Sequence, residues 1–168
     1  DLGNSWQELV LPKIGKDSER DYDTCGDVAF LPGEPASIML LVRQGRLLAS
    51  RDDGKSWQQL KAPPSEFSED LDCSVVLLAV AETDPPTLYI NSGFKLYATR
   101  DLGAHWQYAG IDTLAGDGKR GILIKVLPDP SQPDRVYAVF MQGLAVSKDG
   151  GGSWKTISLK RREDRKGR

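Results

Sequence analysis

The side chains in this sequence that could support chemistry are carboxylates gathered in three polar segments, residues 13–24, 63–72 and 111–120. Carboxylates at short range can form a divalent cation site or a pair of catalytic acids. In a cation site of this kind the ion would be Ca²⁺, and otherwise the sequence predicts no cofactor. The other interpretation, which we favour, is that these are solvated acidic loops without a site. The candidate binding residues are Asp21, Asp23, Asp70, Asp72, Asp112, Asp117 and Arg120.

Composition argues against several other classes of function. The chain has two cysteines and one histidine, whereas a structural zinc site needs four such ligands at close spacing. The net charge is −2, so no overall basic field is present to bind nucleic acid. No apolar run approaches the ~18–20 residues that span a bilayer. We therefore expect no metal ligand set, no nucleic-acid partner, no membrane span and no signal peptide in this chain.

All four tryptophans fall in one repeated motif. The repeat predicts the strands that position these loops. Its motif, S/T-x-D-x-G-x-x-W, occurs as SRDDGKSW (50–57), TRDLGAHW (99–106) and SKDGGGSW (147–154), with a partial copy, DLGNSW, at residues 1–6. The motif aspartates are nearly evenly spaced along the chain. The motif residues, for which we predict a structural role, are Asp1, Gly3, Trp6, Ser50, Asp52, Gly54, Trp57, Thr99, Asp101, Gly103, Trp106, Ser147, Asp149, Gly151 and Trp154.

Each repeat contains four short apolar segments separated by Gly/Pro turns, the pattern of four antiparallel strands. Repeats of about 40–50 residues with four strands are typical of propeller blades. The sequence therefore predicts an all-β fold, a partial β-propeller of three four-stranded antiparallel blades. One extra N-terminal strand is expected at residues 5–11. We expect the propeller domain to span residues 1–158 and residues 159–168 to form a flexible basic tail, or alternatively a docking segment.

The motif's residue types predict a turn between the third and fourth strands that is closed by side-chain hydrogen bonds. The aspartate can accept hydrogen bonds from nearby backbone N–H groups, and the glycine can adopt a conformation that other residues resist. The tryptophan should fill space between neighbouring sheets, where its N–H needs a partner. One copy differs, because His105 replaces the serine found in the others, and we expect that change to weaken one side-chain bond.

These motifs resemble the Asp-box, or BNR, repeats of sialidases, the Vps10/sortilin ectodomain, xyloglucan-active glycoside hydrolases and Ycf48-like photosystem assembly factors. The segment 129–154 is especially similar to the last three groups. The resemblance covers about residues 1–158. It implies that the motif turns lie opposite the binding face, which places the three polar loops on that face. It also implies an extracytoplasmic location, secreted or periplasmic.

The activity is less determined than the fold, because one architecture hosts many functions. A sialidase resemblance would require an R-I-P motif before the first box, and none is present. A xyloglucanase-like activity requires two catalytic aspartates between two propellers. We therefore predict a non-catalytic binding or scaffold module that recognises a protein or glycan. The alternative is part of a secreted glycoside hydrolase, sialidase-like or xyloglucanase-like, whose catalytic residues are completed outside this chain.

Two further expectations concern how the blades are held together. Cys25 and Cys73 occupy equivalent places in adjacent blades, so they are either a disulfide or, as we favour, two buried thiols. Propellers commonly close with 4–8 blades, and three blades leave two apolar sheet faces uncovered. We expect those faces to pack against remaining blades of a parent chain or against a second copy.

Overall fold

The computed structural model describes residues 5, 6, 8, 25–32, 38–43, 46–64, 75–92, 95–112, 122–141 and 143–157. Within them the chain forms twelve strands and no helix, so no described helix could cross a membrane. The strands make three four-stranded sheets in which every neighbouring pair is antiparallel. The predicted all-β class and three-blade count are confirmed.

Each sheet is one blade, and its strands follow one another in sequence order. Blade 1 contains β1 (Cys25–Leu31), β2 (Ile38–Arg43), β3 (Arg46–Ser50) and β4 (Gln58–Gln59). Blade 2 contains β5 (Val75–Ala81), β6 (Thr87–Ser92), β7 (Lys95–Thr99) and β8 (Gln107–Asp112). Blade 3 contains β9 (Leu123–Asp129), β10 (Gln132–Phe140), β11 (Gly143–Ser147) and β12 (Lys155–Ile157).

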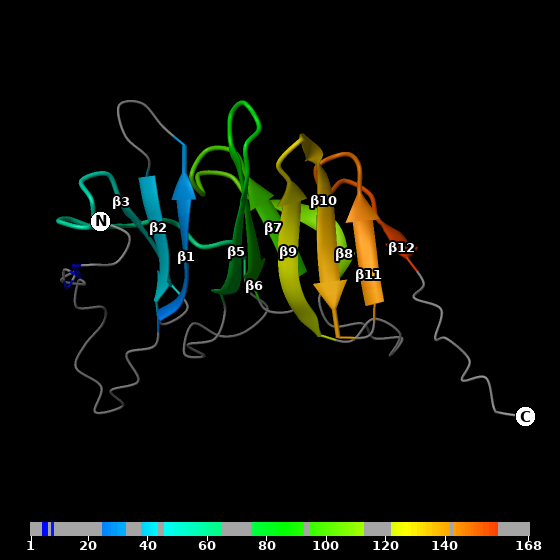
Figure 1. Cartoon of the computed structure of the whole chain (residues 1–168), viewed down its shortest axis with the longest axis horizontal. Helices are drawn as coiled ribbons and strands as arrows, with labels where there is room; N and C mark the ends of the chain where they lie inside the picture. Colours follow the sequence, from blue (N-terminus) through cyan, green and yellow to red (C-terminus); the bar gives the residue numbers. More distant parts are fainter. Residues whose placement is uncertain are drawn as a thin grey trace, which may run out of the picture.

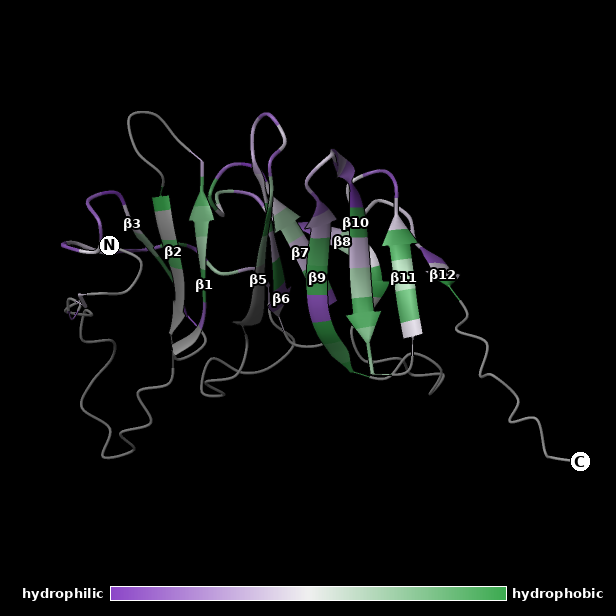
Figure 2. Cartoon of the chain, viewed as in Figure 1, coloured by the Kyte–Doolittle hydropathy of each residue, from purple (hydrophilic) through white to green (hydrophobic). Residues whose placement is uncertain are grey.

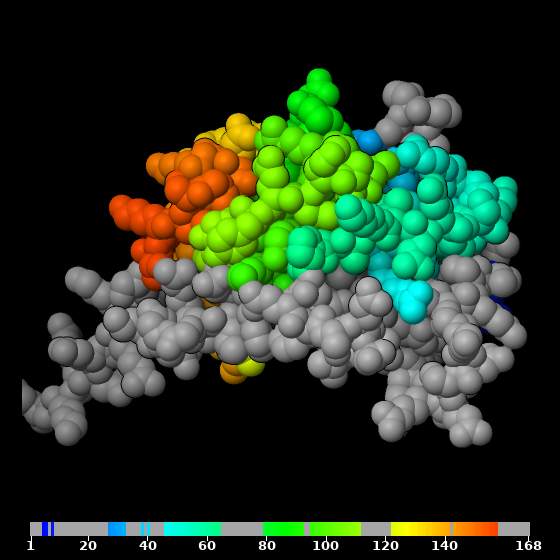
Figure 3. Space-filling view, turned by 180° about the vertical axis from the view of Figure 1, so that it is seen from behind, coloured from blue at the N-terminus to red at the C-terminus, as the bar shows by residue number. Residues whose placement is uncertain are grey.

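The blades stand side by side along the chain, and their first strands are neighbours (Figure 1). Strand β5 contacts β1 on one side and β9 on the other. Seen from behind, the blades appear as successive zones from cyan through green to orange (Figure 3). First strands in contact and fourth strands at the outer edge are the arrangement of consecutive propeller blades.

Two apolar clusters hold the blades together. Leu31, Leu40 and Leu47 of blade 1 pack against Leu88 and Ile90 of blade 2. The second cluster joins blades 2 and 3 and contains Tyr89, Leu96, Ala109, Ile111, Leu123, Val126, Val136, Ala138 and Phe140. Successive residues of a strand point to opposite faces of a sheet, which explains how β6 contributes to both clusters.

Burial along the middle strands shows which sheet faces are covered. All six residues of β6 are buried, because blade 2 has a neighbour on both faces. In β10, buried residues alternate with partly exposed ones from Val136 onward, because only one face is covered. The two end blades are rich in apolar residues, as the green segments of β1 and β11 show (Figure 2). Phe30 of blade 1 is 59% exposed, and Leu127 of blade 3 is 41% exposed.

One expectation for the partial N-terminal motif is wrong, and several others lie outside the described residues. Trp6 is 91% exposed, so it does not fill a gap between sheets. The sheet against which it would pack is not among the described residues. The extra strand at residues 5–11, the domain boundary at 158 and the basic tail stay predictions. Cys73 is not described, so the proposed Cys25–Cys73 pair is untested as well.

Candidate binding groove

The three full motifs form turns of one design, and each lies between the third and fourth strands of its blade, as predicted. In blade 3, Asp149 Oδ1 accepts the backbone N–H of Ser153 at 2.9 Å and Oδ2 accepts the Ser153 hydroxyl at 2.6 Å. Ser147 Oγ donates to Asp149 Oδ1 at 2.7 Å and accepts the Gly151 N–H at 2.8 Å. We call residues 51–57, 100–106 and 148–154 the motif turns.

His105 stands where the other copies have serine, and its side chain still bonds the motif aspartate. Its backbone N–H donates to Asp101 Oδ1 at 2.8 Å, and its Nδ1 lies 2.6 Å from Asp101 Oδ2. The serines of the other turns, Ser56 and Ser153, reach their aspartates at the same 2.6 Å. A carboxylate only accepts, so Nδ1 carries the proton. The side-chain bond is thus retained at the same length, and the expectation that it is weaker stays a prediction.

The motif aspartates are held in the ionised form by these bonds. The Ser56 hydroxyl is the main cause that lowers the pKa of Asp52 to about 2. The His105 N–H does so for Asp101, and the Ser153 hydroxyl for Asp149, each also to about 2. Hydrogen bonds donated to a carboxylate favour its charged form. These three aspartates are therefore structural anions at neutral pH.

We expect this arrangement to make the fold sensitive to acid. The aspartate pKa is 3.8 ordinarily and about 2 in the folded chain. Folding therefore favours the ionised form, and the resulting stability is fully present above about pH 4. It is lost as the pH falls through about 2. Circular dichroism melts between pH 6 and pH 2 should show a melting temperature that falls mainly below pH 4.

A double variant supplies the control for the acid effect. Ser56→Ala with Ser153→Ala removes the hydroxyl bonds that lower the pKa values of Asp52 and Asp149. It should be less stable at pH 6 and should lose less stability than the parent chain between pH 6 and pH 2. A melting temperature that stays constant across this range in the parent chain would contradict the assignment.

The motif tryptophans join each turn to the blade before it. Trp106 Nε1 donates to the Lys61 carbonyl at 3.0 Å, and Trp154 Nε1 donates to the Ala109 carbonyl at 2.5 Å. Each bond links residues 45 positions apart and crosses from one blade to the next. The predicted inter-sheet role of the tryptophan is confirmed for these two copies. Trp57 Nε1 is buried and has no acceptor among the described residues.

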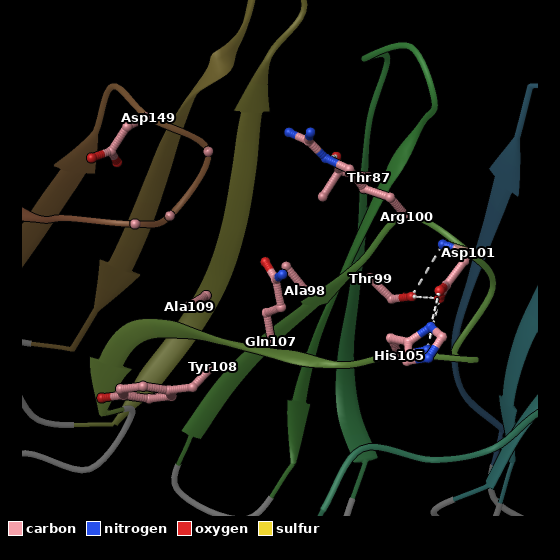
Figure 4. Close-up of a pocket in the computed structure, with 13 residues that line it drawn as sticks. Thr87, Ala98, Thr99, Arg100, Asp101, His105, Gln107, Tyr108, Ala109 and Asp149 are labelled. Carbon is pink, nitrogen blue, oxygen red and sulfur yellow. Dashed lines mark hydrogen bonds and ion pairs between the residues drawn. The ribbon is translucent and has the colours of Figure 1, made fainter.

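A groove of about 330 Å³ lies between the motif turns of blades 2 and 3. Its lining includes Thr87, Arg100, His105, Gln107, Tyr108 and Asp149. In Figure 4 the Asp101–His105 pair lies on one side of the groove and Asp149 on the other. Gln107 projects between them, and the Arg100 guanidinium extends toward the turn that carries Asp149 (Figure 4).

The groove is partly pre-organised by hydrogen bonds beneath it. Arg100 Nε donates to Thr87 Oγ1 at 3.0 Å, and Thr87 Oγ1 is bonded to Thr83 Oγ1 at 2.8 Å. Tyr89 crosses from blade 2 to donate its hydroxyl proton to the Gly150 carbonyl at 3.0 Å. Burial raises the pKa of Tyr89 to about 12, so this bond persists at neutral pH. The Arg100 guanidinium is thus fixed at its Nε, and its outer nitrogens are directed toward the turn that carries Asp149 (Figure 4).

The sequence-based site residues and this groove do not coincide. Asp112 is the last residue of β8, and no side chain is described for it. The remaining loop candidates lie outside the described residues and stay predictions, namely Asp21, Asp23, Asp70, Asp72, Asp117 and Arg120. Sequence reasoning missed Arg100, Gln107 and Tyr108. A signal was present, because the residue before each full motif's aspartate is cationic: Arg51, Arg100 and Lys148.

Known proteins resemble this chain in structure more than in sequence. No protein-family model matches it, and a search of curated proteins finds no significant match. The crystal structure of an ancestral GH74 enzyme superposes with a TM-score of 0.57 at 15% identity, over 83% of this chain and 19% of that chain. YCF48 from Cyanidioschyzon merolae gives 0.52 at 21% identity, over 80% and 37%. The GH74 xyloglucanase from Xanthomonas campestris gives 0.51 at 22%, over 80% and 22%.

These similarities concern one part of each larger protein. The chain spans about a fifth of the GH74 enzymes and somewhat over a third of YCF48. At sequence identities this low, the property that the proteins share is the fold. Together with the three antiparallel four-stranded sheets, they establish that the chain has a β-propeller fold.

Proposed function

We propose that this chain is a non-catalytic binding or scaffold module built from Asp-box propeller blades of the Vps10, xyloglucanase-like and Ycf48-like group. Its ligand would be a protein or a carbohydrate met in an extracytoplasmic compartment. The observation that carries the proposal is the groove between two motif turns. It combines a fixed cation, a half-exposed aromatic ring and polar side chains.

The carboxylates beside the groove favour binding over catalysis. A glycosidase of the common type needs two carboxyl groups, one of which has a raised pKa and donates a proton. Asp101 and Asp149 instead have pKa values of about 2, and both are engaged by their own turns. A carboxylate held this way cannot act as a general acid at neutral pH. In this proposal they shape the groove and contribute charge.

The other groups suit an extended ligand with a polar backbone. Tyr108 is about half exposed and packs edge-on against Tyr97, with ring centroids 6.3 Å apart. An amphipathic ring beside hydrogen-bonding groups can stack on a sugar or pack against a peptide side chain. The Arg100 guanidinium can form charge-assisted hydrogen bonds with a carboxylate or a carbonyl oxygen.

The binding test uses named probes and a matched pair of cationic positions. Isothermal titration should be run with xyloglucan oligosaccharides, with sialyllactose and with peptides selected from a random display library. We expect one class to bind and the Arg100→Ala variant to lose about tenfold in affinity, equivalent to about 1.4 kcal/mol. Lys148→Ala, which changes the equivalent exposed position of blade 3 outside the groove, should bind as the parent chain does. Equal losses in both variants would contradict a site at the groove.

The enzyme alternative needs a separate measurement of turnover. The purified chain should be incubated with xyloglucan and with sialosides, and the products should be quantified. We expect no hydrolysis above background. Hydrolysis that Asp70→Asn or Asp117→Asn abolishes would refute the non-catalytic proposal and assign chemistry to the polar loops.

A further inference from the structure

The residue between the motif aspartate and the motif glycine decides what borders the space between two blades. It is Leu102 in blade 2 and Gly150 in blade 3, and both have a positive φ, 55° and 67°. Leu102 packs against the apolar cluster between blades 1 and 2. A Cβ built on Gly150 would instead lie 3.7 Å from Tyr89 Oη and 3.8 Å from Arg100 Nη2. The place that a leucine side chain takes at the first contact is thus bordered by polar groups at the second.

A second exchange, at the first residue of the second strand, accompanies the first. This residue is Ile38 in β2 and Thr87 in β6, and both are buried. Thr87 Oγ1 accepts the bond that holds Arg100 Nε at 3.0 Å. Ile38 belongs to the apolar cluster and has no side-chain acceptor with which to hold Arg51, the equivalent of Arg100. The contact between blades 1 and 2 shows that two blades can be joined with apolar residues at both places.

The charges around the groove favour a neutral ligand. Among the described residues that line it, the charged ones are Arg100, Asp101 and Asp149. A third carboxylate lies close by, because Asp134 Oδ1 is 4.0 Å from the Cβ position built on Gly150. An acidic ligand would add to this excess of negative charge, and a cationic one would meet Arg100 beside Gly150. A neutral ligand avoids both repulsions.

The hydrogen-bonding groups of the groove suit hydroxyls, which both donate and accept. Beside Gly150, the Arg100 guanidinium can only donate and the Asp134 carboxylate can only accept. The Gln107 amide does both, and it projects into the groove (Figure 4). Tyr108 is about half exposed and offers an aromatic face to an apolar ring face. Adjacent hydroxyls on a ring that also has an apolar face are the chemistry of a sugar.

We propose that the groove binds a neutral oligosaccharide, with adjacent hydroxyls of one sugar ring bonded to Arg100 and Asp134 beside Gly150. This inference rests on the proposed binding function and narrows its ligand to an uncharged carbohydrate. The groove volume of about 330 Å³ is at the lower end of the range of small-molecule sites. Gly150 is the specificity-determining residue, because a leucine at this position of the turn occupies the equivalent place in the first contact.

A charge series of hexasaccharides tests the ligand class by isothermal titration at pH 7. The neutral probes are the hexamers of β-1,4-glucose, α-1,4-glucose and N-acetylglucosamine. Hexagalacturonate is the acidic probe, and the glucosamine hexamer is the cationic one. We expect at least one neutral hexamer to bind and both charged hexamers to bind at least about tenfold more weakly.

Exchanging the two turn residues tests the position of the site. Gly150→Leu should weaken binding of the neutral hexamer at least about tenfold. Leu102 has nearly the same φ in the equivalent turn, so the variant introduces a side chain that this turn already accepts elsewhere in the chain. Leu102→Gly, the reverse change at the other contact, should bind as the parent chain does. Circular dichroism melts should show that both variants are folded at the temperature of the titration.

A further variant keeps the test decisive if Gly150→Leu does not fold. Thr87→Val removes the acceptor for Arg100 Nε without adding a side chain to the groove, and it should weaken binding at least about threefold. Arg51→Ala, at the equivalent position of blade 1, should have no effect.

The outcomes separate this inference from the proposed function. A displayed peptide that binds, while no neutral hexamer binds up to about 5 mM, overturns the carbohydrate inference and leaves the binding function standing. Equal losses in Gly150→Leu and Leu102→Gly, or tighter binding of a charged hexamer, also overturn it. Hydrolysis of a bound neutral hexamer would refute the non-catalytic function but support the ligand class.

Discussion

Gly103→Ala is expected to destabilise the fold by about 2–5 kcal/mol, a larger effect than any other single added methyl group discussed for this chain. Gly103 has a φ of +86°, where an L side chain is strained. An added Cβ would lie 2.7 Å from the Lys61 carbonyl oxygen and 3.3 Å from the Trp106 ring. The oxygen belongs to the backbone of the preceding blade, so it cannot move aside as a flexible side chain could.

The measurement is thermal and urea unfolding at fixed protein concentration, so that any association contributes equally. Gly143→Ala is the matched control, because a Cβ there meets no atom within 4 Å and Gly143 has no positive φ. Its free energy of unfolding should change by less than about 0.5 kcal/mol. A Gly103→Ala variant as stable as this control would show that the motif turn does not press against the preceding blade.

The motif turns could be predicted from sequence because each residue type acts within a few positions. In blade 3 one turn contains all the bonded groups, Ser147, Asp149 and Ser153, so their spacing alone specifies the bonds. The replacement by His105 could not be judged from residue type, because it depended on the reach of a ring nitrogen in one turn. Local spacing also did not show that the residue before the motif glycine has a positive φ, even where it is Leu102 at 55°.

The groove could not be predicted because it joins residues that are distant in sequence. Thr87, Arg100 and Asp149 come together only when β6, the end of β7 and the turn after β11 are packed side by side. The inter-blade bonds have the same character, since the tryptophan acceptors lie 45 residues upstream. The strand pattern predicts which residues form strands. Which residues of two sheets come into contact depends on strand register and turn geometry. The expectation that the motif side carries no site rested on resemblance and is untested, although the groove that we propose as a binding site lies on that side.

Tyr89→Ala is expected to destabilise the fold by about 3–5 kcal/mol, as for the removal of a large buried aromatic side chain. Tyr89 is 1% exposed, packs in the cluster between blades 2 and 3, and bonds the Gly150 carbonyl. Tyr89→Phe keeps the ring and loses only the bond, so it should cost about 1 kcal/mol. Urea unfolding of both variants separates the packing contribution from the hydrogen bond.

Tyr137, which occupies the equivalent position in the next repeat, supplies the control. Its side chain lies on the outer face of blade 3, where no described sheet covers it. In a dilute monomer Tyr137→Ala should therefore cost less than about 1 kcal/mol. Equal destabilisation by the two alanine variants would contradict the assignment of Tyr137 to an uncovered sheet face.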